Sequence, residues 1–264
     1  MRILVCFKVV YDLENITPQE LLSLQNGSLD LAVFKKIFGT YDEAALETAL
    51  RLAENLCEQS ETVTLHGLTA GKCENRFLEN LFPLGFDDLF CIQPEKDFSW
   101  QPELTAGCIT AFVKDSGGYD IILTGKQAGP GENGLIPRML AHRLGYAFVP
   151  EVFSLEHMRG GIRVISKTDA GRAAMTVKLP AVFPVGEALH SYLRVPTLRE
   201  KIAAGSREVH YWSTETPPKT GPGSGNFIHY IYTMTQRNCR MIDGNTLSEK
   251  LENLWPYVQK TDKP

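Results

Sequence analysis

The 264-residue sequence lacks the usual marks of a secreted, metal-binding or membrane-spanning protein. Its six cysteines are scattered with no Cys-x-x-Cys pair, and its six histidines show no metal-ligand spacing. No apolar run approaches the length that crosses a membrane, and the first one, ILVCF, is too short for a signal peptide. We therefore expect reduced thiols, no bound metal, no membrane span and a cytoplasmic location.

Charge and motif content are also restrictive. The net charge is -4, without the concentrated basic face that general nucleic-acid binding requires. No Gly-x-Ser-x-Gly elbow is present, so serine-hydrolase chemistry has no anchor. The acidic residues Asp42, Glu43 and Glu47 are more typical of a helix N-terminus than of paired catalytic carboxylates. These features argue against a nucleic-acid binder and a serine hydrolase.

Apolar strands and amphipathic helices alternate through the first half of the chain. The predicted strands are 2–10, 61–68, 88–92 and 120–125, and the predicted helices are 40–56, 72–84, 103–114 and 135–144. Thr40 and Glu43 have the spacing of a capping box, and Gly85 and Gly145 suit helix ends. The alternation predicts an α/β fold with a doubly wound, mostly parallel sheet of the adenine-nucleotide-binding type.

The pattern changes after Val149. Four short strands at 151–158, 161–168, 173–179 and 180–185, joined by glycine-containing turns, predict a β-meander appended to the sheet. A short helix is predicted at 197–205. Residues 212–227 contain three prolines and three glycines, which predicts an extended arm. We therefore divide the chain into an α/β nucleotide-binding domain (1–211) and an arm with a terminal helix (212–264).

The terminal helix is amphipathic. Thr246 and Glu249 have capping-box spacing, and Leu247, Leu251 and Leu254 form an apolar stripe. The stripe alone does not decide whether its own domain or a partner subunit covers it. A lone domain has little use for such an arm, which favours a partner subunit.

The stretch TGKQAGPGENG, residues 124–134, is the most specific candidate site. Glycines allow positive φ and let a phosphate approach main-chain N–H groups at a helix N-terminus. The spacing Gly129-x-Gly131-x-x-Gly134 is not a dinucleotide fingerprint, because that motif follows the first strand of a βαβ unit. A nucleotide or flavin phosphate site is favoured, and a glycine-rich loop without a ligand is the alternative.

Three side chains near this loop are further candidates for nucleotide contacts, and two of them also have a purely structural interpretation. Lys126 would add a cationic contact to a phosphate. Lys8, at a strand end, would either meet a phosphate or be a solvated edge lysine. Tyr41 would either stack on an adenine or flavin ring or form a hydrophobic staple before its helix.

Four segments, in order, resemble the electron-transfer flavoprotein β subunit family. They are RILVCFKVVYD, YDEAALETALRLAE, DIILTGKQA, and LPAVFPV with RVPTLREKI after it, which together cover roughly residues 1–207. Gly39-Thr40-Tyr41 stands where the family has Asn-Pro-Phe, and Leu135 and Ile136 replace a polar pair. The chain is identified as a divergent member of that family.

The resemblance implies a non-catalytic electron-transfer subunit. It implies a heterodimer with an α subunit that carries the redox FAD, and electron relay from a flavin dehydrogenase on which Leu198 would anchor. This chain would itself bind AMP or, in bifurcating members, a second FAD. The other function left open is a free-standing adenine-nucleotide sensor or hydrolase of the same fold.

The resemblance and the loop chemistry together give one set of candidate nucleotide-binding residues. They are Cys6, Lys8, Gly39, Thr40, Tyr41, Asp42, Thr69, Gly125, Lys126, Gln127, Gly129, Gly131, Glu132, Asn133, Gly134 and Leu135.

Overall fold

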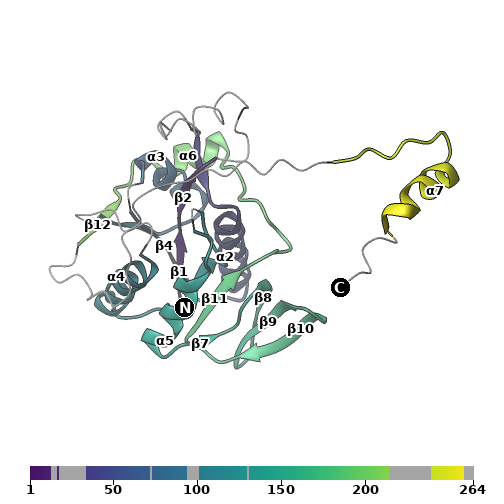
Figure 1. Cartoon of the computed structure of the whole chain (residues 1–264). Coiled ribbons are helices and arrows are strands. Elements are labelled where there is room, and N and C mark those ends of the chain that lie inside the picture. Colours follow the sequence, from purple (N-terminus) through teal and green to yellow (C-terminus); the bar gives the residue numbers. More distant parts are fainter. Residues whose placement is uncertain are drawn as a thin grey trace.

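The computed structural model describes residues 1–12, 17, 34–71, 73–93, 101–129, 131–213 and 239–258 (Figure 1). Its strands are β1 (Arg2–Phe7), β2 (Val9–Tyr11), β3 (Lys36–Phe38), β4 (Thr64–Ala70), β5 (Asp88–Ile92), β6 (Ile121–Gly125), β7 (Ala147–Phe148), β8 (Val152–Met158), β9 (Gly161–Thr168), β10 (Gly171–Val177), β11 (Ala181–Val185) and β12 (His210–Trp212). Its helices are α2 (Thr40–Glu58), α3 (Asn75–Glu79), η2 (Phe82–Leu84), α4 (Pro102–Asp115), α5 (Leu135–Leu144), α6 (Leu198–Ala204) and α7 (Leu247–Val258).

The described residues form one large sheet with helices on both faces. The strand order is β10-β9-β8-β11-β6-β1-β4-β5-β12, and β7 pairs beside β11. The strands from β11 to β12 run parallel. Helix α2 covers one face, and α4 and α5 cover the other (Figure 1). The predicted α/β class with a mostly parallel sheet is confirmed.

Strand β1 divides the core between the two faces. Its side chains alternate, so Ile3 and Val5 join the cluster beneath α2, which includes Leu46. Leu4 and Cys6 point the other way, into the cluster that includes Phe112 of α4. A strand that is apolar at every position is what burial on both faces requires.

The strand predicted at 2–10 is wrong in its second half. β1 ends at Phe7, and β2 pairs antiparallel with β3 in a separate two-stranded sheet. The break falls at Lys8, whose N–H donates to the Asp42 carboxylate instead of to a neighbouring strand.

The helix predicted at 72–84 is also wrong. Only Asn75–Glu79 is α-helical, and a 3₁₀ turn, Phe82–Leu84, follows. Pro83 lacks an N–H and its ring clashes with the preceding turn, which strongly disfavours an α-helix that continues through it. Gly85 has a φ of 112° and closes the turn, as predicted.

The β-meander consists of three strands, not four. β8, β9 and β10 pair antiparallel as predicted. The fourth predicted strand is β11, which instead lies parallel to β6, with Ala181 opposite Ile121. All five of its residues are buried, which is typical of a central parallel strand rather than of a meander strand with one exposed face.

The capping box predicted at Thr40 and Glu43 is wrong. Thr40 is the first residue of α2, and its N-cap is Gly39, with no side-chain cap. The N–H of Glu43 donates to the Gly39 carbonyl at 2.9 Å.

The C-terminal part combines an edge strand with an exposed helix. β12 pairs parallel with β5, so Trp212, which the sequence analysis places in the arm, belongs to the sheet. Residues 214–238 of the arm lie outside the described residues. Within the ranges given above, no helix is both long and apolar enough to cross a membrane.

Helix α7 is the terminal helix predicted from the sequence. Thr246 Oγ1 accepts the Glu249 N–H at 3.3 Å, but the Glu249 carboxylate reaches the N–H of Asn245 rather than that of Thr246. The predicted capping box is therefore only half present. No residue of α7 is buried, and the predicted stripe of Leu247, Leu251 and Leu254 is exposed.

Candidate functional site

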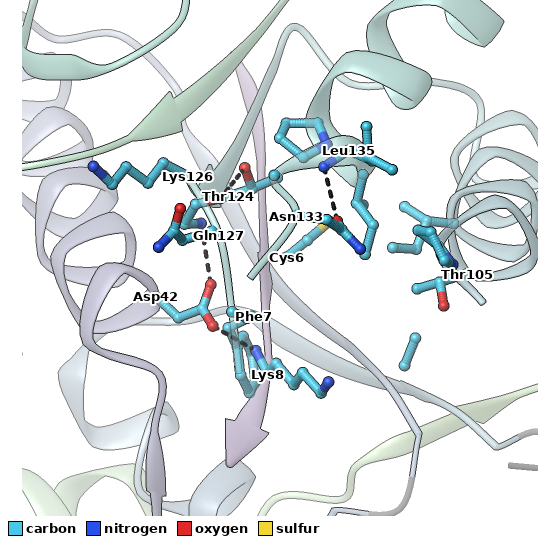
Figure 2. Close-up of a pocket in the computed structure, with 18 of the residues that line it drawn as sticks. Cys6, Phe7, Lys8, Asp42, Thr105, Thr124, Lys126, Gln127, Asn133 and Leu135 are labelled. Carbon is cyan, nitrogen blue, oxygen red and sulfur yellow. Dashed lines mark hydrogen bonds between the residues drawn. The ribbon is translucent and has the colours of Figure 1, made fainter. Parts of the chain in front are cut away.

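A cavity lies at the carboxyl edge of the parallel strands, between the ends of β1, β4 and β6 and the starts of α4 and α5 (Figure 2). The chain runs outward from β1 through β4 to β5 and then returns to the other side of β1 with β6. The connections on the two sides of this point leave the sheet in opposite directions, which opens a crevice. Such reversal points are where open α/β sheets bind ligands.

Nine of the sixteen candidate residues line this cavity. They are Cys6, Lys8, Asp42, Gly125, Lys126, Gln127, Asn133, Gly134 and Leu135. The other seven lie outside its lining, namely Gly39, Thr40, Tyr41, Thr69, Gly129, Gly131 and Glu132.

Helix α4 provides a part of the cavity lining that was not predicted from the sequence. Pro102, Thr105 and Ile109 line the cavity, and Thr105 lies on the side away from Asp42 (Figure 2). A signal was present: the predicted helix 103–114 follows a parallel strand, so it begins near the same edge of the sheet as the loop. The family-like segments do not include this helix.

Asp42, in the first turn of α2, ties two strand ends together (Figure 2). Its Oδ2 accepts the Lys8 N–H and its Oδ1 accepts the Gly125 N–H, each at 3.1 Å. The residue is 4% exposed. Burial raises the pKa of Asp42 to about 7, although the two N–H groups and the charge of Lys8 act in the opposite direction.

Two glycines make room for this carboxylate. A Cβ on Gly125 would lie 2.5 Å from Asp42 Oδ1, and a Cβ on Gly39 would lie 2.6 Å from Oδ2. The next N–H, that of Lys126, donates to the Val185 carbonyl. The absence of a side chain at Gly125 therefore makes room for Asp42. The Gly125 N–H, which was predicted to bind a phosphate, donates to the Asp42 carboxylate instead.

The later part of the loop leads into the N-terminus of α5. Gly131 and Gly134 have φ angles of 105° and 61°, a region that favours glycine. Asn133 Oδ1 accepts the Leu135 N–H at 3.0 Å. Within the described part of the loop, the N–H groups of Gln127, Asn133 and Gly134 make no hydrogen bond. This end of the cavity, with its helix dipole, is the part best suited to an anion.

The Lys126 side chain points away from the cavity (Figure 2). Its Nζ lies 3.3 Å from Glu151 Oε2 and 4.6 Å from the centre of the Tyr41 ring. Burial alone would lower the pKa of Lys126, but hydrogen bonding to Tyr41 and the charge of Glu151 raise it. The ammonium group and the Tyr41 ring thus contact each other rather than the cavity.

The rest of the lining is largely apolar. Leu68, Ala70 and Ile109 contribute side chains from β4 and α4. Burial, and then the charge of Asp42, raises the pKa of the Cys6 thiol, so this group is a neutral part of the wall. Among the described residues, no cluster of His, Cys, Asp or Glu side chains is arranged to hold a metal ion.

A second candidate region lies on the surface beside α2. Leu198, the first residue of α6, is 74% exposed, and its sequence neighbours Leu189, Tyr192, Val195 and Ile202 are also exposed. Thr197 caps α6 through a full capping box with Glu200, which the sequence analysis did not predict.

Comparison with known proteins decides the family. Residues 35–213 match the electron transfer flavoprotein domain, which is more than half of the chain. The chain belongs to the electron transfer flavoprotein family. The matched residues run from β3 to β12 and include the surface around Leu198 and most of the cavity lining. Strand β1 and the cavity residues Cys6 and Lys8 lie outside the matched range.

Curated relatives agree with this assignment. The Escherichia coli K12 protein named "Putative electron transfer flavoprotein subunit YgcR" is 28% identical over all of both chains. The electron transfer flavoprotein subunit beta of Syntrophomonas wolfei is 24% identical, over 84% of this chain and 88% of its own. That of Megasphaera elsdenii is 26% identical, over 79% of this chain and 77% of its own.

Proposed function

We propose that this chain is a β-like subunit of an electron transfer flavoprotein and that it binds an adenine nucleotide in the cavity at the β1 and β6 ends. The main support for this proposal is the composition of that cavity. It joins a helix N-terminus with unused N–H groups to a largely apolar wall, at the reversal point of a parallel sheet. AMP and the adenylate part of FAD present the same chemistry, a phosphate joined through a ribose to a flat heteroaromatic base.

The two ends of this cavity would bind different parts of the nucleotide. The main chain of Gln127, Asn133 and Gly134 would hold the phosphate, and α4 with Leu68 would pack on the base. A bound FAD would supply the electron-transfer chemistry, while this chain binds, orients and shields it. Asp42 would hold the loop in place from behind rather than contact the nucleotide.

The proposal includes a heterodimer with an FAD-carrying α subunit. The relatives are named as subunits, which supports an assembly of more than one chain. The exposed stripe of α7 supports the view that the terminal helix packs on that subunit. The exposed Leu198 supports docking of a flavin dehydrogenase, because one apolar side chain entering a pocket can dominate a transient interface.

The test is nucleotide binding with a charge probe at the α5 N-terminus. Asn133→Asp keeps the oxygen that accepts the Leu135 N–H but adds a negative charge beside the phosphate position. We expect AMP or FAD affinity, measured by calorimetry, to fall about tenfold or more. Asn55→Asp, which adds the same charge on the exposed side of α2 and outside the cavity lining, is the matched control and should leave affinity unchanged.

Mass spectrometry of the small molecule released on denaturation identifies the ligand. The proposal fails if the chain, alone and with an α subunit, releases no nucleotide and binds neither AMP nor FAD. A colourless monomer that binds ATP and pairs with no flavoprotein chain would instead favour a free-standing adenine-nucleotide sensor or hydrolase.

A further inference from the structure

Residues 189–198, the docking segment, are held in place by contacts outside regular secondary structure. It forms neither helix nor strand before Leu198, so its main chain needs partners other than a regular ladder. Its side chains alternate sharply in exposure. Tyr192 is 80% and Val195 84% exposed, whereas Leu193 packs against the core.

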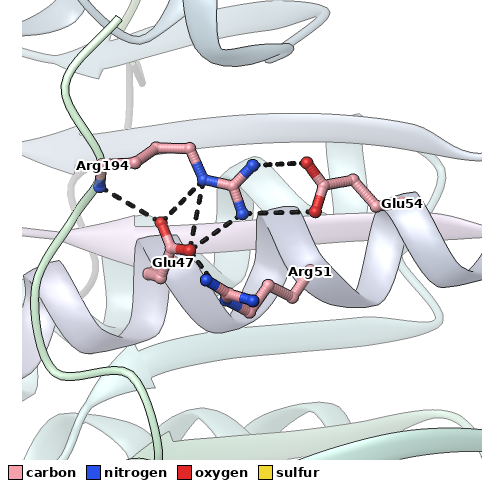
Figure 3. Close-up of polar contacts among 4 residues, drawn as sticks. All are labelled: Glu47, Arg51, Glu54 and Arg194. Carbon is pink, nitrogen blue, oxygen red and sulfur yellow. Dashed lines mark hydrogen bonds and ion pairs between the residues drawn. The ribbon is translucent and has the colours of Figure 1, made fainter.

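Carboxylates on one face of α2 supply those partners (Figure 3). The Arg194 N–H donates to Glu47 Oε2 at 3.2 Å. The main chain of the preceding residue, Leu193, interacts with the Glu43 carboxyl, and this interaction acts to lower the Glu43 pKa against the effect of burial. Glu43 and Glu47 lie one turn apart on α2. The main chain of the docking segment is therefore held at Arg194 by a carboxylate of this helix, and Glu43 faces the residue before it.

The Arg194 side chain adds a second, directional attachment. Its Nη2 lies 2.8 Å from Glu47 Oε1, its Nε 3.0 Å from Glu47 Oε2, and its Nη2 also 3.2 Å from Glu54 Oε2. Glu47 is 1% exposed, and a buried carboxylate of this kind requires charged or hydrogen-bonding partners. The planar guanidinium fork satisfies two carboxylates in a single orientation, which an ammonium group cannot do.

We propose that Arg194 is a positioning residue for partner docking: by binding Glu47 and Glu54, it fixes the docking segment before a partner arrives. Tyr192, Val195 and Leu198 are then presented together, and the partner does not have to order the loop on binding. This inference rests on the proposed function, because the partner that it assumes is a flavin dehydrogenase.

The first measurement is hydrogen exchange on the purified heterodimer, followed by mass spectrometry. In Arg194→Gln we expect the amide of residue 194, which donates to Glu47, to exchange about tenfold faster or more than in the wild type, with β1 and β6 unchanged. Arg199→Gln, which removes the same charge from exposed α6, is the matched control and should not change exchange. Equal exchange at the amide of residue 194 in the wild type and in Arg194→Gln overturns the proposal.

The second measurement is steady-state kinetics with a purified flavin dehydrogenase that reduces the wild-type heterodimer. Arg194→Gln should raise the KM for the heterodimer about tenfold and leave kcat unchanged, because it weakens docking and not electron transfer. Arg194→Lys keeps the charge but not the planar guanidinium group, and its KM should lie between those of the wild type and Arg194→Gln. Leu198→Ala should raise KM without faster exchange.

The outcomes separate the two proposals. Faster exchange in Arg194→Gln with an unchanged KM overturns the positioning role, even though the segment is held as described. If no flavin dehydrogenase reduces the wild-type heterodimer, the proposed function fails. The exchange measurement then decides by itself whether Arg194 fixes the segment.

Discussion

Asp42 and Glu47 are two buried carboxylates on the same helix, little more than one turn apart, yet they differ in ionisation. The partners of Asp42 are two main-chain N–H groups, and its pKa is raised to about 7 because burial dominates. The partners of Glu47 are Arg194 and Arg51. Burial would also raise the pKa of Glu47, but hydrogen bonds from Arg194 outweigh it and lower the pKa. Similar burial thus has opposite results when the donors are neutral or cationic.

The two carboxylates also hold different parts of the molecule. Asp42 joins the ends of β1 and β6 beside the cavity, whereas Glu47 holds the docking segment. Only the first of these attachments titrates near neutral pH.

The largest expected difference between them is in the pH dependence of stability. The folded pKa of Asp42 lies above its unfolded value, so the folded state keeps a proton that the unfolded state has lost between about pH 4 and pH 7. The free energy of unfolding of the wild type should therefore fall relative to Asp42→Asn as pH rises through this window, by up to roughly 4 kcal/mol.

Urea denaturation of both proteins at several pH values measures this difference. Glu47→Gln provides the contrast, because the lowered pKa of Glu47 stabilises the fold above its unfolded pKa and that stability is lost as pH falls. Parallel pH profiles for the wild type and Asp42→Asn would contradict the account of Asp42.

The next largest effect should come from crowding the Asp42 carboxylate. Gly125→Ala places a methyl group 2.5 Å from Oδ1 and 3.0 Å from main-chain atoms of α2, so strand or helix must shift. We expect a loss of about 3 kcal/mol in the free energy of unfolding, measured in urea. Gly129→Ala, where the methyl group meets open space and φ is not positive, should change it by less than about 0.5 kcal/mol.

Removal of the Glu47 charge should cost somewhat less, because Glu54 still pairs with Arg194. We expect Glu47→Gln to lower the free energy of unfolding by about 2 kcal/mol at pH 7. Glu54→Gln is the matched control on the same helix. Its carboxylate is 50% exposed, so the loss should stay below about 1 kcal/mol. Equal losses would mean that burial of Glu47 has no special weight.

The smallest effect is expected at Arg51. It also pairs with Glu47, at 2.8 Å, but as an exposed i,i+4 partner within one helix. Arg51→Gln should lower the free energy of unfolding by only about 0.3 to 0.5 kcal/mol. A loss as large as that of Glu47→Gln would show that Arg51, and not Arg194, is the main partner.

Local sequence patterns predicted most of the helices and strands, but they did not predict which distant strands pair with each other. Strand and helix periodicity was enough for the parallel sheet, and Pro83 was a signal that the helix at 72–84 should have been divided. The position of β11 depends on β6, about sixty residues earlier, and no local pattern encodes that pairing.

The same limit applies to the sites. The loop at 124–134 was found because glycines are locally conspicuous. The hydrogen bond from Gly125 to Asp42 could not be predicted in the same way, because the two residues are 83 positions apart in sequence. The Glu47–Arg194 pair spans 147 residues, and single-sequence patterns carry no information about such contacts.

The edge position of β12 has a practical consequence for shortening the chain. His210–Trp212 covers the outer side of β5, which would otherwise be the last strand of the sheet. A truncation meant to remove the arm should therefore keep Trp212. A chain cut before His210 would leave a row of unpaired amide and carbonyl groups along β5, a template on which other molecules assemble into aggregates.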